Sequence, residues 1–267
     1  MLEPPEFASE TWVQPGRAWR NRPGLSGFTL VELLVVIAII AILTSLLFAG
    51  LGTGREKSRR ADCLNLERQF VMASHLYAND NDQRLPAPGT DNYNLEDTHT
   101  PILSTRSATN LMNYMTLASL DCPNLHPWMQ RRGNWRNHLN YGIAVGYHFL
   151  GGHRGTPWDP PPGTTNRWIS PQKTDADPAL PLVADLNIYC YSFQRILAPH
   201  TLHGPIVRED NYFAANDGAI NETPVNIGGQ GGNVALLDGS AAWRPMRKMK
   251  PYRASHLWAA DGSFGYW

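Results

Sequence analysis

The chain has no excess of charge of either sign, since 23 Lys and Arg residues balance 23 Asp and Glu residues. This balance leaves no electrostatic footprint for nucleic acid, which requires a basic patch or stripe. Catalytic signatures are missing as well: the sequence contains no Gly-x-Ser-x-Gly elbow, phosphate loop, dinucleotide fingerprint or His-Glu-x-x-His motif. We therefore expect neither a nucleic-acid-binding protein nor an enzyme.

Cysteine is scarce, with Cys63, Cys122 and Cys190 as the only 3 residues of this type. They are too few for a disulfide scaffold, and no two form a Cys-x-x-Cys pair, so the sequence does not indicate zinc or thioredoxin chemistry. If the globular part of the protein is exported, one disulfide can form, and Cys63–Cys122 is the favoured pair. The alternative is buried free cysteines that behave as small hydrophobic residues.

The 9 histidines show no metal-ligand spacing. His200 and His203 lie three positions apart and could share a metal with Asp185, with Asp210 and Asp217 downstream. Histidines beside a proline in a loop are more often solvated or act as helix caps. A membrane-anchored hydrolase built on these residues is accordingly the least favoured function.

One long apolar run stands out against this background. No residue from Leu33 to Leu51 is charged, and only Thr44 and Ser45 are polar. At about 1.5 Å per helical residue the run approaches the ~30 Å thickness of a bilayer's hydrocarbon core. Glu32 stands at its entrance, and a carboxylate there is costly unless it finds a partner.

The segment Gly27-Phe28-Thr29-Leu30-Val31-Glu32-Leu33, with its apolar continuation, closely resembles the processing site of type IV prepilins and type II secretion pseudopilins. The resemblance implies that a prepilin peptidase cleaves after Gly27 and that the new Phe28 amine is N-methylated. It also implies that Glu32 pairs with the terminal amine of a neighbouring subunit. A plain membrane anchor or an uncleaved signal sequence is the alternative.

This resemblance divides the chain into four parts. Residues 1–27 are a leader peptide that is cleaved, and residues 28–54 are the transmembrane and assembly part of a stem helix. Residues 55–80 form its amphipathic part, and residues 81–267 form a globular pilin-like head. Three glycines at alternate positions predict a weak point in the stem: Gly50, Gly52 and Gly54.

One face of the amphipathic part carries apolar residues at helical intervals, and we expect it to pack on the head: Cys63, Leu66, Phe70, Ala73 and Tyr77. The charged residues are expected mostly elsewhere: Arg55, Glu56, Arg59, Arg60, Asp62 and Glu67. After the stem, Asp80 and Asp82 are weak Ca²⁺ candidates, although the spacing is not that of an EF-hand. A solvated helix end is the ordinary interpretation, and we expect no required cofactor.

The head is rich in Gly and Pro, with 23 and 21 residues, which favours short strands and loops. We predict a helix over 108–119, strands over 140–149, 180–185 and 188–193, and a surface loop over 151–172 that exposes Trp158 and Trp168. Asp238-Gly239 between two apolar runs predicts a hairpin.

This hairpin stretch resembles the C-terminal domain of large pseudopilin-like families of planctomycetes and verrucomicrobia, which carry a His-x9-Asp-Gly motif. Asp238, Gly239 and Trp243 match that pattern, but Gly228 stands at the histidine position. Any role tied to that histidine therefore does not transfer to this chain.

Together these features predict an α+β fold: a long N-terminal helix, half transmembrane and half amphipathic, packed on a C-terminal antiparallel sheet with loop-rich insertions. The expected function is that of a structural subunit of a type IV pilus-like or type II secretion pseudopilus filament. Such a subunit sits in the inner membrane as a single-pass protein, with its head in the periplasm or on an extracellular filament. Its partners are the prepilin peptidase, other pilin or pseudopilin subunits and an inner-membrane assembly platform. The alternative is a minor tip pseudopilin or adhesin that binds polysaccharide or a secretion substrate through aromatic loops.

Overall fold

The computed structural model describes residues 28–89, 99–131, 142–161, 163–190, 195–201, 204–208, 227–255 and 263–267. The chain divides into two compact units, residues 1–47 and 48–267, and each is described by itself. The predicted leader, with its cleavage residue Gly27, lies outside the described residues. The same holds for His203, Asp210 and Asp217.

The first unit contains the start of helix α1 (Leu30–Asn79). The Thr29 backbone N–H and hydroxyl both donate to Glu32 Oε2 at 2.8 Å, and the Glu32 N–H donates to Thr29 Oγ1 at 3.2 Å. These reciprocal bonds form a capping box, which satisfies donors that the first turn of a helix leaves unpaired. The helix therefore begins at the residue pattern Thr-x-x-Glu.

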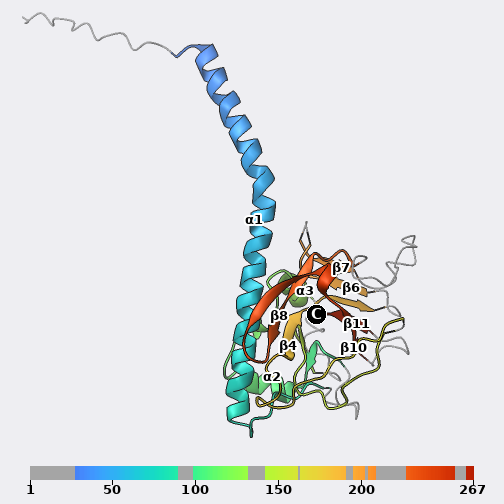
Figure 1. The fold of residues 1–267 in the computed structure, drawn as a ribbon. Coiled ribbons are helices and arrows are strands. Elements are labelled where there is room, and N and C mark those ends of the chain that lie inside the picture. The colour runs from blue at the N-terminus through green and yellow to red at the C-terminus, as the bar shows by residue number, and fades with distance from the viewer. Residues whose placement is uncertain are drawn as a thin grey trace, which may run out of the picture. The chain divides into compact units, whose positions relative to one another are not determined.

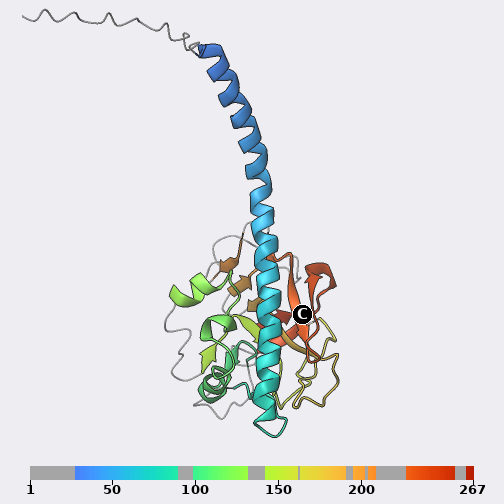
Figure 2. The same ribbon diagram turned by 90° about the vertical axis from the view of Figure 1, so that its left-hand side faces the viewer.

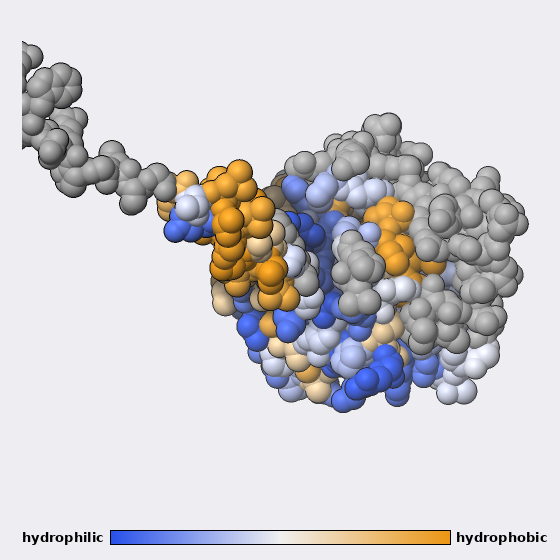
Figure 3. All heavy atoms as spheres, turned by 90° about the horizontal axis from the view of Figure 1, so that it is seen from above, coloured by the Kyte–Doolittle hydropathy of each residue, from blue (hydrophilic) through white to orange (hydrophobic). Residues whose placement is uncertain are grey.

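Apolar side chains cover this part of α1 on all sides, and the large ones from Phe28 to Leu47 are exposed (Figure 3). Its two hydroxyls are satisfied within the helix, since Thr44 donates to the Ile40 carbonyl at 2.8 Å and Ser45 to the Ile42 carbonyl at 2.7 Å. A helix that is apolar all round and satisfies its own polar groups suits lipid. By length and composition α1 can cross a membrane.

The predicted stem helix is confirmed from Leu30 to Asn79, and it runs without a break through Gly50, Gly52 and Gly54. A weak point at these glycines stays a prediction. The helix ends where Asn81 Nδ2 donates to the Tyr77 carbonyl at 2.7 Å and Asp82 and Gln83 take positive φ angles of 52° and 61°.

The second unit holds the antiparallel sheets of the head (Figure 1). The four-stranded sheet has the order β3-β4-β8-β9, with bounds Tyr147–Phe149, Pro181–Asp185, Gly231–Leu236 and Ala241–Pro245. The five-stranded sheet has the order β10-β11-β5-β6-β7, with bounds Pro251–Ser255, Ser263–Tyr266, Ile188–Cys190, Arg195–Ala198 and Ile206–Arg208. A small sheet pairs β1 (Ile102–Leu103) with β2 (Ile143–Ala144).

The described residues of the head also form short helices: α2 (Thr105–Leu111), η1 (Leu117–Leu120), α3 (His126–Arg131) and η4 (Met246–Lys248). The predicted helix over 108–119 is therefore wrong in extent, because α2 ends at Leu111 and a separate 3-10 turn follows. The strand predicted over 140–149 is split into β2 and β3. Between them the Gly146 N–H donates to the Leu120 carbonyl at 2.8 Å instead of to a strand partner.

The C-terminal half of α1 runs along the four-stranded sheet (Figures 1 and 2). His75 Nε2 contacts the Leu237 carbonyl at 2.7 Å, and Phe70 stacks on Phe149 of β3 with ring centroids 5.1 Å apart. Phe70 and Phe149 are fully buried in the core. The predicted α+β fold, with a helix packed on antiparallel strands, is confirmed. Within the described residues the strands belong to three sheets instead of one.

Two local predictions for the head have opposite outcomes. The Asp238-Gly239 hairpin is confirmed between β8 and β9, with Gly239 at φ 85°. The exposure predicted for Trp158 and Trp168 is wrong, since both are buried and their rings meet edge to face at 5.0 Å. Trp168 Nε1 donates to the Arg253 carbonyl at 2.9 Å, so the Pro-rich segment packs its indoles inward.

Candidate functional site

The N-terminal segment is the first candidate site. Phe28 is exposed, and Glu32 is the only acidic residue in the first turn of α1. The capping box occupies Oε2 of Glu32, so the capping contacts leave Oε1 available to another donor. An accessible carboxylate at the end of an apolar helix is suited to pair with a cationic group from another chain.

A second site lies in the core of the head. The side chains of Cys63, Cys122, Asp185 and His200 are all buried, and one donor atom from each lies within 4.8 Å of the other three. We call these four residues the buried cluster. Cys63 comes from α1, Cys122 follows η1, Asp185 ends β4 and His200 follows β6.

One face of α1 brings several polar groups to this place. Glu56, Cys63 and Glu67 are separated by seven and four positions, which is the spacing of one helical face. All three are buried. The expectation that Glu56 and Glu67 lie away from the head is therefore wrong. Both carboxyl groups face the head, where His200 and Asn124 contact Glu56 and the charge of Asp185 acts on Glu67.

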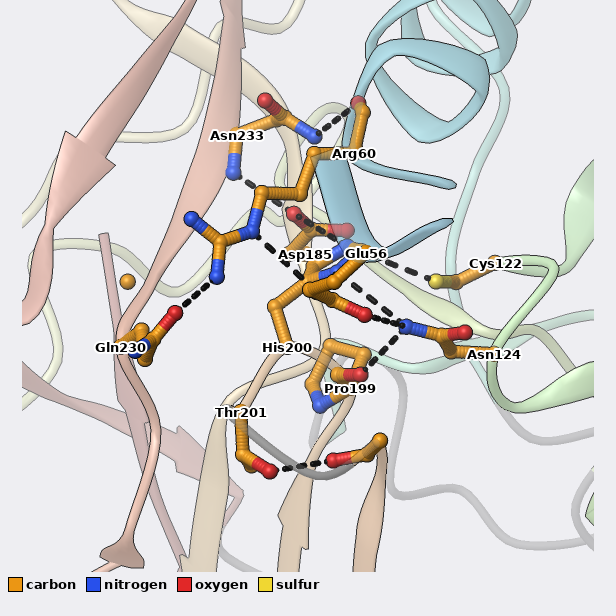
Figure 4. A network of polar contacts seen from close by, with 12 residues as sticks. Glu56, Arg60, Cys122, Asn124, Asp185, Pro199, His200, Thr201, Gln230 and Asn233 are labelled. Carbon is orange, nitrogen blue, oxygen red and sulfur yellow. Dashed lines mark hydrogen bonds and ion pairs between the residues drawn. The ribbon is translucent and has the colours of Figure 1, made fainter. Parts of the chain in front are cut away.

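The histidine stands at the centre of the contacts (Figure 4). His200 Nε2 lies 3.7 Å from Cys122 Sγ and 3.4 Å from Asp185 Oδ2. On the other side of the ring, Nδ1 lies 2.7 Å from Glu56 Oε1. His200 is thus buried between carboxylates and a thiol, and the expectation of a solvated histidine is wrong.

Further hydrogen bonds hold the carboxylates in place. Asn124 Nδ2 donates to Glu56 Oε2 at 3.1 Å and to the Pro199 carbonyl at 2.8 Å. The Asn233 N–H donates to Asp185 Oδ2 at 2.6 Å. Each carboxylate is therefore oriented by a group from another segment.

Arg60 covers the outer side of the same network. Its Nε donates to Glu56 Oε1 at 3.2 Å, and its guanidinium group bonds the side chain of Gln230. The guanidinium lies 4.1 Å above the ring of Trp243, a cation–π contact. Trp243, singled out with the hairpin, thus helps to close the network from β9.

Several buried oxygens near the cluster have no hydrogen-bond partner among the residues that the structure describes. They are Asp185 Oδ1, both carboxylate oxygens of Glu67 and the hydroxyl of Tyr147. A buried polar atom without a partner costs roughly 1–3 kcal/mol, so such atoms are rare in native proteins. Because these atoms lie close together, we infer that the described protein groups alone do not satisfy the polar atoms around the cluster.

Burial and neighbouring charges shift several pKa values here. Burial alone would lower the pKa of His200, but the charge of Asp185 and hydrogen bonds to Asp185, Cys122 and Glu56 raise it to about 12. Burial, and then the charge of Asp185, raises the pKa of Glu67 well above its usual range. Burial raises the pKa of Cys63 in the same way. Burial also opposes ionisation of Glu56, yet hydrogen bonds from His200 and Asn124 lower its pKa.

The structure brings together some of the residues predicted from sequence and separates others. Cys63 and Cys122 do meet, but as free thiols, so the predicted disulfide is not present. His200 and Asp185, noted as possible metal partners, are also brought together. Nothing in the local sequence around Glu56, Glu67 or Asn124 indicated that these residues complete the network.

The two weak calcium candidates lie in the turn after α1. Asp80 accepts a hydrogen bond from the Tyr114 hydroxyl, and Asp82 lines a small open pocket together with Arg84 and Arg154. Among the described residues, the buried cluster is the one group of His, Cys, Asp and Glu donors close enough to share an ion, and neither aspartate belongs to it.

Residues 25–48 match the model of the prokaryotic N-terminal methylation motif. No curated protein and no solved structure matches the chain.

The matched motif and the apolar helix define a membrane-anchored protein with a prepilin-type N-terminus. With its helix followed by antiparallel sheets, the chain is a type IV prepilin- or pseudopilin-like protein.

Proposed function

We propose that this protein is a structural subunit of a type IV pilus-like or type II secretion pseudopilus filament. The observation that carries the proposal is the methylation motif at residues 25–48, joined to a helix whose apolar side chains are exposed all round. Such an apolar surface must be covered either by lipid or by the same surface of neighbouring subunits. Before assembly the membrane lipid covers it, and in the filament the helices of neighbouring subunits cover it.

In this role the chain begins as a single-pass inner-membrane protein with its head in the periplasm. A prepilin peptidase cleaves after Gly27, and the exposed Phe28 amine is methylated. Glu32 then pairs with the terminal amine of the next subunit as an assembly platform moves subunits into the filament. The pairing neutralises two charges inside an apolar bundle, where either alone is costly. The role is structural and not catalytic.

The alternative of a tip adhesin with aromatic binding loops gains no support from Trp158 and Trp168. Both indoles are buried in the head and are not available to a ligand. We therefore keep the filament subunit as the single proposed function.

The experiment that tests the proposal is intact-mass analysis and N-terminal sequencing of the protein purified from its host. The expected chain begins with N-methylated Phe28, and a Gly27→Ile variant is expected to keep its leader. A purified filament fraction should contain the processed wild-type chain and lack the unprocessed variant. A wild-type chain that still begins at Met1, or one cut after Leu51, would contradict the proposal.

A further inference from the structure

We propose that Cys63, Cys122, Asp185 and His200 bind one Zn²⁺ ion as a structural centre of the head. The four donor atoms lie within 4.8 Å of one another and are buried, as structural zinc sites require. The inference concerns the head alone and does not depend on the proposed filament role.

The distances between donors fit a tetrahedral ion. At the usual zinc bond lengths, tetrahedral geometry places a nitrogen and an oxygen donor about 3.4 Å apart and a sulfur and a nitrogen donor about 3.6 Å apart. In the structure His200 Nε2 lies 3.4 Å from Asp185 Oδ2 and 3.7 Å from Cys122 Sγ. The donors therefore surround a position that one ion can occupy with little movement.

The surrounding contacts prepare the histidine for this task. A metal-binding histidine usually donates its other ring N–H to a carboxylate, which fixes the tautomer and orients the ring. The 2.7 Å contact of His200 Nδ1 with Glu56 Oε1 supplies this arrangement and leaves Nε2 directed toward Cys122 and Asp185. Asn124 and Arg60 in turn hold Glu56.

The oxygens without partners point to the same conclusion. Asp185 Oδ1 and both oxygens of Glu67 are buried and have no hydrogen-bond partner among the described residues. A cation at the cluster offsets this accumulation of negative and polar groups, which a void would not. A Cys63–Cys122 disulfide, in contrast, would leave Asp185, His200 and Glu67 as they are.

The donor set selects the kind of metal. Two thiols, one imidazole and one carboxylate are a mixed sulfur, nitrogen and oxygen set, which zinc accepts in tetrahedral geometry. Calcium and magnesium prefer oxygen donors and higher coordination numbers. Because four protein donors fill the coordination sphere and all are buried, the centre is structural and does not hold a reactive water.

The test uses the full chain purified in detergent from host membranes, without a polyhistidine tag, reductant or added metal. Elemental analysis is expected to find about one zinc per chain. After unfolding in denaturant and chelator, an alkylating reagent should label both Cys63 and Cys122. A chain without stoichiometric zinc, or with a Cys63–Cys122 disulfide in peptide mapping, would overturn the proposal.

Substitutions in the buried cluster test whether the zinc is bound there. Cys122→Ser and His200→Gln are expected to lose the bound zinc, whereas the matched controls Asp238→Asn and His75→Gln retain it. Asp238 is exposed in the hairpin turn, and His75 contacts the Leu237 carbonyl, away from the cluster residues. Zinc that remains at full stoichiometry in a Cys63→Ser/Cys122→Ser variant would place the metal elsewhere and overturn the proposal.

A measurement on the wild-type chain covers the case in which these variants do not fold. Removal of zinc by a chelator under mild denaturation is expected to lower Tm, and added Zn²⁺, but not Mg²⁺ or Ca²⁺, to restore it. Reconstitution with Co²⁺ should produce a thiolate-to-cobalt absorption band. An unchanged Tm, or a cobalt spectrum without thiolate character, would contradict a Cys-ligated centre.

Discussion

The Glu56 carboxylate and the His200 imidazole meet at 2.7 Å although 144 positions of sequence separate them. The contact joins α1 to the segment after β6, and both side chains are almost completely shielded from water. The two groups form a buried ion pair whenever the imidazole is protonated. Removing one member of such a pair destabilises the fold strongly, because the other charge stays buried without a partner.

Replacing Glu56 is therefore expected to destabilise the head strongly. Glu56→Leu should lower the free energy of unfolding by about 3–5 kcal/mol, the usual cost of removing one member of a buried pair. Glu56→Gln keeps a hydrogen-bond acceptor and should lose less. Chemical denaturation of the full chain in detergent, followed by tryptophan fluorescence, measures both. Lys57→Ala at the exposed neighbouring position serves as the control and should change stability by less than about 0.5 kcal/mol.

Glu32 has two separable tasks, capping the helix and offering a charge to a neighbour. Glu32→Gln keeps the capping box, which accepts Glu or Gln, but removes the charge. Thr29→Val breaks the box and keeps the charge. If charge pairing drives assembly, Glu32→Gln should reduce the amount of subunit in the filament fraction far more than Thr29→Val does.

The readout for these two variants is quantitative immunoblotting of filament and membrane fractions. N-terminal sequencing accompanies it, since both variants are expected to be processed at Gly27 like the wild type. Equal incorporation of Glu32→Gln and wild type would rule out the pairing role.

The turn between β8 and β9 depends on a left-handed residue. Gly239 has φ 85° and open space where a Cβ would be added, so a substitution meets backbone strain without a steric clash. Gly239→Ala should destabilise the head by about 1 kcal/mol. Gly239→Asn should cost less, because Asn tolerates this conformation better than other residues with a Cβ. Thermal unfolding of the two variants compares them, and equal losses would show that backbone strain is not the cause.

Gly146 permits the approach of the segment that carries Cys122. A Cβ at this position would lie 2.8 Å from both Asp121 Cα and Cys122 N, which forces the backbone apart. Gly146→Ala should therefore cost about 1–3 kcal/mol of stability. It should also weaken metal retention by the cluster. Gly155→Ala is the matched control, because its nearest neighbour, Trp158 Nε1, lies at an ordinary 3.6 Å.

Glu67 predicts a dependence of stability on pH. Since burial raises the pKa of its carboxyl in the folded state, the unfolded chain releases this proton at a lower pH than the folded chain does. The folded state consequently loses stability as pH rises above the usual glutamate pKa, until the folded-state value is reached. Glu67→Gln should be more stable than wild type, by a margin that grows with pH over this interval. Denaturation at several pH values measures the margin, and a margin that shrinks with rising pH would contradict it.

The elements that could be predicted from sequence are those with a local cause. The apolar run that starts at Leu33, the strand that ends at Asp185 and the Asp238-Gly239 turn each carry their signal within a few residues. All three appear in the structure. The N-terminal motif was recognised for the same reason.

The buried cluster has no such local cause. Cys63, Cys122, Asp185 and His200 come from four segments far apart in the sequence, and only the tertiary fold brings them together. Glu56 and Glu67 look like solvated helix residues in the sequence because partners from the head are invisible there. Trp158 and Trp168 are buried for a related reason: the flanking prolines predict an exposed loop, but the two indoles pack against each other in the core.

Because Cys63 and Phe70 lie on α1, a fragment that contains the whole head must include the second half of this helix. Both are completely buried in the head, so the second half of the helix forms an integral side of the core. A fragment that starts at residue 81 would leave the four-stranded sheet with an uncovered apolar face, and aggregation would follow. A fragment that starts just before Glu56 keeps the whole core and omits the lipid-facing run. The smallest independently folding piece therefore begins in the middle of the helix and not at its end.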